Sequence, residues 1–229
     1  MGMRNEDLVT LLEHLYHDVL MTAETPFLRL ASILRASSPK TLDFPAIYAL
    51  ARRYIENMFQ GFPQPLGHLD HLEDALALAN DHDLPIRKTV LYALVVSSDF
   101  NTESEDAQSD VSLVVPGLAD PVPSKLTSKD AQSCRRLMES LIDHFTAMLF
   151  TPAATPHMAC TDVFADTWMP LVIQPALEDD GVYKPIESLQ RIIEIDWPSK
   201  GLCPSCVTEK RAEWLGEQKE VWRKLDEWI

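Results

Sequence analysis

The feature that most constrains this chain is the pair Cys203 and Cys206, which is separated by Pro204 and Ser205. Two thiolates at this spacing can hold one metal ion from a tight turn, and proline and serine suit such a turn. A periodic helical stretch follows, so the positive end of a helix dipole favours the thiolate, the form that binds metal. The motif therefore predicts a metal site, or a redox dithiol, at the start of a helix.

A second pair, His157 and Cys160, has the same spacing, and it also lies between a loop and an expected helix. The two pairs offer one imidazole and three thiolates, a donor set typical of tetrahedral zinc. Residues 161–202 separate the pairs, so a shared ion would link two distant helix starts. Four protein ligands leave no position for an activated water, and we therefore expect a structural zinc site formed by His157, Cys160, Cys203 and Cys206.

Other interpretations of the cysteines remain open at this point. The thiols could be buried without any ligand, since cysteine behaves as a small hydrophobic residue. The fourth ligand is the least determined part, because His144 or Cys134 could replace His157. Cys134 precedes Leu137 and Met138 on an apolar helical face, which favours a place in the core.

The apolar residues recur at helical spacing in nearly every segment, which predicts an all-α protein of packed helix pairs. Proline, serine or aspartate marks the start of most segments. The expected helices are Leu8–Val19, Phe27–Arg35, Phe44–Phe59, Leu69–His82, Pro85–Ser98, Leu137–Leu149 and Pro204–Trp228. Only Val111–Val115 has a pattern typical of a strand.

An acidic stretch with several prolines interrupts this pattern between Asp99 and Asp130. Such a composition is typical of a long loop or linker. We therefore expect a helical region over residues 1–100, an acidic loop over 101–130, and a helical region with the zinc site over 131–229.

The formal net charge of −15 repels phosphate backbones and anionic lipid, and no basic patch offsets it. The basic residues near the C-terminus alternate with glutamates, which predicts an ion-paired helix face. No run reaches the roughly 18 apolar residues of a membrane span. With no secretory signal and only four cysteines, we expect an intracellular protein, cytoplasmic or nuclear, that binds neither nucleic acid nor membrane.

Other groups of polar residues carry weaker signals. His14 with His17, and His68 with His71, have helical i, i+3 spacing, but we expect surface or half-buried histidines there. Asp179, Asp180 and Gly181 predict a turn, because the further ligands of a calcium loop are missing. No serine lies in a GxSxG context, so no catalytic nucleophile is nominated.

Five tryptophans lie in the C-terminal half, and they are expected to be core and helix-docking residues rather than a partner-binding surface. On the last expected helix, a single apolar stripe should contain Trp214, Leu215, Val221, Trp222, Leu225 and Trp228.

Three segments together resemble the region that follows the BTB/POZ core in BTB-domain proteins of mushroom-forming fungi. They are Leu42–Tyr54 (LDFPAIYALARRY), Ala75–Ala79 leading to His82–Ile86, and the Cys203–Cys206 motif with its tryptophan-containing charged helix. In this resemblance the chain begins where the BTB core would end. The family implies a protein-interaction role, with self-association or adaptor activity.

The sequence therefore predicts a non-catalytic scaffold or adaptor that binds protein partners, with self-association as one form, and that contains a structural zinc. The alternative is a zinc-dependent hydrolase, in which fewer protein ligands hold the metal and a carboxylate serves as base.

Overall fold

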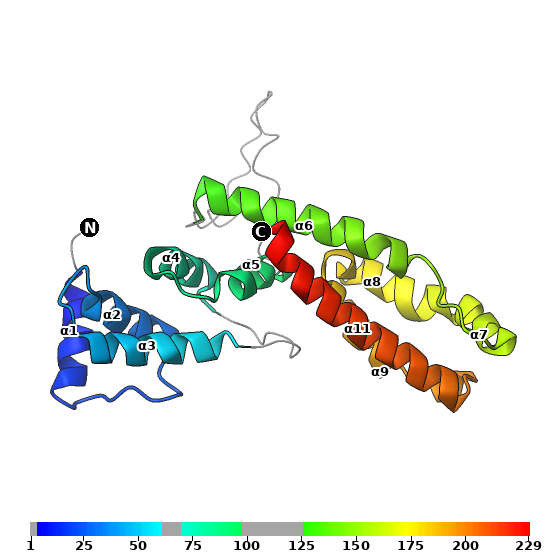
Figure 1. Ribbon diagram of the computed structural model, residues 1–229, viewed down its shortest axis with the longest axis horizontal. Coiled ribbons are helices and arrows are strands. Elements are labelled where there is room, and N and C mark those ends of the chain that lie inside the picture. Colours follow the sequence, from blue (N-terminus) through cyan, green and yellow to red (C-terminus); the bar gives the residue numbers. More distant parts are fainter. Residues whose placement is uncertain (1–3, 61–69, 98–125) are drawn as a thin grey trace, which may run out of the picture. The chain divides into compact units, whose positions relative to one another are not determined.

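The computed structural model describes residues 4–60, 70–97 and 126–229, and every regular element in these ranges is a helix. The all-α prediction is confirmed (Figure 1). The strand expected at Val111–Val115 and most of the acidic loop lie outside the described residues, as does His68. None of the described helices has the length and apolar character needed to cross a bilayer.

Contacts divide the chain into two compact units, and the division falls between Val90 and Leu91. This boundary lies inside α5 (Arg87–Val96). The second half of α5 belongs to the C-terminal unit, where the buried Tyr92 hydroxyl donates a 2.6 Å hydrogen bond to Glu187 Oε2. Tyr92 also meets the ring of Trp222 edge-on.

In its described residues, the N-terminal unit contains four complete helices and the start of α5, and α2 packs against both α1 and α3. The four complete helices are α1 (Asn5–Leu15), α2 (Phe27–Ser37), α3 (Pro45–Met58) and α4 (Leu72–His82). Aliphatic side chains form most of the buried interior, including Leu11, Leu30, Ile33, Leu34, Ile55 and Leu76. A bidentate ion pair joins α1 to α2, because Arg35 donates to both carboxylate oxygens of the buried Asp7 at 2.7 and 3.0 Å.

The first helix is shorter than its apolar pattern predicts. It ends at Leu15 because Tyr16 already leaves the helical conformation and His17 takes a left-handed backbone with φ of 63°. His14 and His17 therefore do not share one helical face, and the expected i, i+3 pair on a helix is wrong.

The C-terminal unit continues from α5 with a series of helices that ends in the 25-residue α11. The helices are α6 (Ser128–Leu149), α7 (Met158–Trp168), the π-helix η1 (Met169–Ile173), α8 (Gln174–Glu178), the 3₁₀ turn η2 (Gly181–Tyr183), α9 (Pro185–Glu194), α10 (Trp197–Lys200) and α11 (Pro204–Trp228). α11 packs against both α9 and α6.

The structure corrects one predicted helix boundary in this unit and matches another. α6 begins at Ser128, so Asp130 lies in a helix rather than in the loop expected to end there. Thr127 explains the earlier start, because its hydroxyl accepts a 3.1 Å hydrogen bond from the Asp130 amide and caps the helix. α11 has the predicted bounds, and Pro204 occupies the first turn as expected for a residue without an N–H group.

Four aromatic rings form the centre of the C-terminal core. Phe164 meets Trp168, Trp197 and Trp214 edge-on, with ring centroids 4.9 to 6.1 Å apart. The indole N–H of Trp168 donates to the Leu149 carbonyl and that of Trp197 to the Ile192 carbonyl, each at 2.8 Å. These three tryptophans are buried, as predicted. Leu215 is an exception to the predicted stripe of α11, because 41% of its surface remains exposed.

Candidate metal centre

The four residues expected to bind metal come together in the C-terminal unit. One ligand atom from each of His157, Cys160, Cys203 and Cys206 lies within 4.8 Å of the other three. The His157 Nδ1 atom is 3.2 Å from the Cys203 sulfur and 3.4 Å from the Cys206 sulfur. This is the spacing at which a single ion can be shared by four donors.

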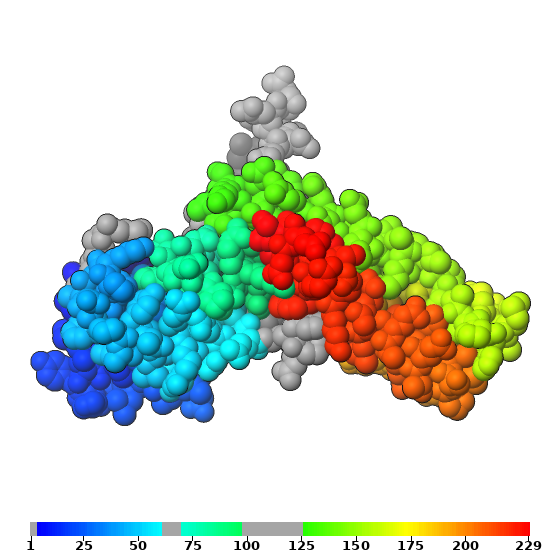
Figure 2. All heavy atoms as spheres, viewed as in Figure 1, coloured from blue at the N-terminus to red at the C-terminus, as the bar shows by residue number. Residues whose placement is uncertain are grey.

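The two pairs occupy equivalent positions on two helices. His157 is the N-cap of α7 and Cys203 is the N-cap of α11, while Cys160 and Cys206 lie in the respective first turns. Both helices therefore direct their positive N-terminal ends toward the sulfur atoms, which favours negative charge there. The start of α7 and the start of α11 lie side by side at the surface (Figure 2).

A threonine pair holds the segment that carries His157. The Thr155 amide donates to the Thr161 hydroxyl at 3.0 Å, and that hydroxyl donates back to the Thr155 carbonyl at 3.1 Å. The Thr155 hydroxyl donates to the His157 carbonyl at 2.9 Å. These bonds close a loop around the first turn of α7, so that His157 and Cys160 keep a defined orientation.

The other pair is held by the turn between α10 and α11. Gly201 ends α10 with φ of 105°, a left-handed conformation that costs glycine little and other residues more. The Leu202 amide then donates to the Trp197 carbonyl at 3.2 Å, and the Leu202 side chain is buried. The aromatic core therefore determines where Cys203 begins the next helix.

The site lies at the edge of the aromatic core. Cys160 and Cys206 are buried members of the same cluster as Phe164 and Trp197, whereas Cys203 is half-buried and His157 is exposed. Three of the ligands are thus anchored by packing, and the fourth is supplied from the solvent side.

The thiols of Cys203 and Cys206 have very different pKa values. The Cys206 backbone amide, followed by the His157 imidazole, lowers the pKa of Cys203 to about 6. Burial, followed by the adjacent Cys203 thiol, raises the pKa of Cys206 to about 11. At neutral pH the Cys203 sulfur is therefore already a thiolate, whereas Cys206 must release a proton to become a metal ligand.

The alternatives for the fourth ligand are not part of this group. Cys134 is fully buried in α6, as its apolar neighbours predicted. His144 lies on the same helix, where its Nε2 atom is 2.8 Å from Glu217 Oε1 of α11. Among the described residues, the structure therefore favours His157 as the fourth donor.

The weaker signals of the sequence do not form a second centre within the described ranges. His71 stacks against Phe27 with ring centroids 6.2 Å apart, and it precedes α4 with φ of 66°. Asp179 and Asp180 form the turn expected between helices, with Asp180 at φ of 56°.

Sequence reasoning missed the surroundings of the centre rather than its ligands. The burial of the tryptophans was predicted, but their position behind the sulfurs and the Thr155–Thr161 loop were not anticipated, although threonines before a helix are a known capping signal. Helix α9 was also missed. Pro185 in its first turn, followed by Ile186, Leu189 and Ile192 at helical spacing, is the signal that could have identified it.

Comparison with protein-family models, with curated proteins and with solved structures finds no match to this chain.

Proposed function

We propose that this protein is a non-catalytic protein-interaction scaffold or adaptor whose C-terminal unit is held together by one structural zinc ion. The observation that carries the zinc assignment is the convergence of four ligand atoms within 4.8 Å from two helix starts far apart in the sequence. Three thiolates and one imidazole match the soft and borderline donors that zinc takes in closed tetrahedral sites.

The charge of the site is consistent with this assignment. Three thiolates and one divalent cation leave one net negative charge, and the N-terminal ends of α7 and α11 both favour an anion at that position. The Cys203 thiol, with a pKa of about 6, offers a ligand that is deprotonated before the ion arrives.

Two rival functions explain less of the geometry. A redox dithiol would use Cys203 and Cys206, and the low pKa of Cys203 fits it, but it gives no role to His157 or Cys160. A zinc hydrolase needs an open coordination position, whereas four protein ligands fill a tetrahedral ion.

An exposed apolar surface on the N-terminal unit supports the interaction role. Val9, Leu12 and Tyr16 recur at helical spacing along α1 and its C-cap, and Tyr16 is 75% exposed. Val19 and Leu20, beyond the turn at His17, are also about half exposed. Exposed apolar side chains that gather on one helix face are typical of protein-binding surfaces. The resemblance to the helical region after a BTB core points to the same role.

Metal content measured with thermal unfolding tests the zinc centre. We expect about one zinc per chain in the wild type and loss of both metal and stability in Cys206→Ser, because structural zinc binding is coupled to folding. Cys134→Ala is the matched control, since that cysteine lies outside the centre and should retain the metal. A folded wild-type protein that contains no metal contradicts the zinc centre, and a metal that can be removed without loss of fold favours the hydrolase.

Sedimentation velocity at increasing protein concentration tests the interaction surface with a second copy as the partner. A dimer that Tyr16→Glu dissociates, and that Glu24→Gln leaves intact, supports self-association through α1. A strictly monomeric wild type contradicts self-association and leaves the surface for a different protein.

A further inference from the structure

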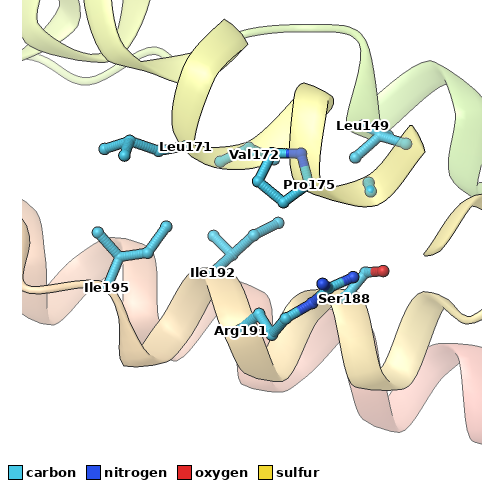
Figure 3. A pocket seen from close by; sticks show the side chains of 9 residues that line it. Leu149, Leu171, Val172, Pro175, Ser188, Arg191, Ile192 and Ile195 are labelled. Carbon is cyan, nitrogen blue, oxygen red and sulfur yellow. The ribbon is translucent and has the colours of Figure 1, made fainter. Parts of the chain in front are cut away.

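A second candidate site lies in the C-terminal unit, in a groove between the η1–α8 segment and α9. Figure 3 shows Leu171, Val172 and Pro175 on one wall and Ile192 and Ile195 on the other. The groove has a volume of about 240 Å³. Leu149, Ala176, Ser188 and Arg191 complete its lining, so polar side chains come only from α9.

The backbone of the upper wall explains why this space is not filled by packing. η1 is a π-helix, and it is followed without a break by α8, which has Pro175 in its first turn. Pro170 and Pro175 lack an N–H group, so the normal helical hydrogen bonds cannot be made at these positions. The wider π turn shifts Leu171 and Val172 relative to an α-helical register, and such turns occur often at ligand sites.

Arg191 is the one positively charged side chain among the residues that line the groove. Arg191 is paired with Asp179, and this pair is largely exposed. Asp179 accepts a hydrogen bond from one terminal nitrogen of the Arg191 guanidinium. A guanidinium has five N–H donors, so others of Arg191 can donate to a ligand. The buried Ser188 hydroxyl is already used, because it donates to the Gly181 carbonyl at 2.9 Å.

Glycine at position 181 lets these groups come together. A Cβ atom there would lie 2.6 Å from the Ser188 hydroxyl oxygen and 2.9 Å from a guanidinium nitrogen of Arg191. Any larger residue would therefore displace the charged group from the end of the groove. The approach of Arg191 to an apolar groove is thus built into the local backbone.

We propose that this groove binds an aliphatic carboxylate of medium chain length, with the hydrocarbon between α9 and the η1–α8 segment and the carboxylate on Arg191. The volume of about 240 Å³ has the size of a short aliphatic chain rather than of a large ring system. A carboxylate accepts two hydrogen bonds from one guanidinium, which gives the anion an advantage over an alcohol of equal length. The net charge of −15 disfavours the binding of an anion elsewhere on the chain.

Titration of the 229-residue chain with octanoate tests this proposal, with isothermal calorimetry as the readout and 1-octanol as the uncharged probe. We expect saturable octanoate binding that weakens roughly tenfold or more in Arg191→Met, a change equivalent to about 1.4 kcal/mol. Octanol should bind more weakly to the wild type and be indifferent to the same substitution. Asp179→Asn should strengthen octanoate binding several-fold, because it frees Arg191 from its competing carboxylate.

Arg223→Met is the matched control, since Arg223 lies on α11 in exposed ion pairs with Glu220 and Glu227 and does not line the groove. Far-ultraviolet circular dichroism establishes that each variant is folded. Octanoate binding that is absent at millimolar concentration, or that is equal in the wild type and folded Arg191→Met, overturns the proposal.

Discussion

The two units of this protein are stabilised in different ways. In the N-terminal unit, aliphatic side chains from α1 to α4 fill the interior, and the Asp7–Arg35 ion pair joins two helices. In the C-terminal unit, Phe164 and three tryptophans form the core, and the Cys/His centre lies at its edge.

The C-terminal unit contains short pieces beside its long helices α6 and α11. α10 contains four residues and the 3₁₀ turn η2 contains three, too few to be stable by their own hydrogen bonds. Large aromatic surfaces and a metal ion can hold such short pieces in place, because each acts on several segments at once. The N-terminal unit, with helices of 11 to 14 residues, has no comparable centre among its described residues.

Metal removal should have the largest effect, and it should separate the two units. With a chelator, we expect hydrogen exchange to accelerate strongly in α7 and in the first turns of α11, because metal binding contributes directly to folding. Exchange in α2 and α3 should change little. Equal loss of protection in both units would show that the centre does not act locally.

Truncation of the aromatic core should have the next largest effect. Trp197→Ala removes a fully buried ring and its hydrogen bond to the Ile192 carbonyl, so we expect a loss of about 3–5 kcal/mol in unfolding free energy. Urea denaturation measures this loss. Trp228→Ala, at a half-buried position near the end of α11, is the control and should cost much less.

The ion pair of the N-terminal unit should contribute less. Asp7→Asn leaves Arg35 without its carboxylate partner, but Arg35 is one-third exposed and can be hydrated. We therefore expect a loss of about 1–3 kcal/mol, below the range for a fully buried pair. Exchange in α1 and α2 should report the change. Asp18→Asn, at an exposed position, serves as the control, and an equal effect there would contradict a specific role for the pair.

Acidification should give the smallest effect within the same unit. Burial raises the pKa of Asp7, but the hydrogen bonds and the charge of Arg35 lower it by more. The pKa of Asp7 in the folded protein is therefore below its ordinary value of 3.8. The unfolded chain therefore binds this proton first, and the contribution of Asp7 is complete above about pH 4 and lost as the pH falls through the folded-state pKa. The difference in stability between wild type and Asp7→Asn should shrink over this range. A constant difference would be inconsistent with the lowered pKa.

Local signals explain which parts of the fold could be predicted. Pro204 and the following apolar spacing defined α11 correctly, because a helix start depends on a few adjacent residues. The end of α1 was missed, since the apolar pattern continues to Val19 while the backbone turns at His17. The π-helix and its groove were not anticipated, because they depend on how α9 packs opposite Pro175.

The sequence by itself determined the helical class and the thiol donors Cys160, Cys203 and Cys206, because both follow from residue spacing and donor chemistry. The tertiary structure alone decided that His157, rather than Cys134 or His144, faces the three sulfurs. It also decided that Arg191 lies at the end of an apolar groove. Both outcomes depend on which helices pack together across long stretches of chain, and residue spacing does not encode those distances.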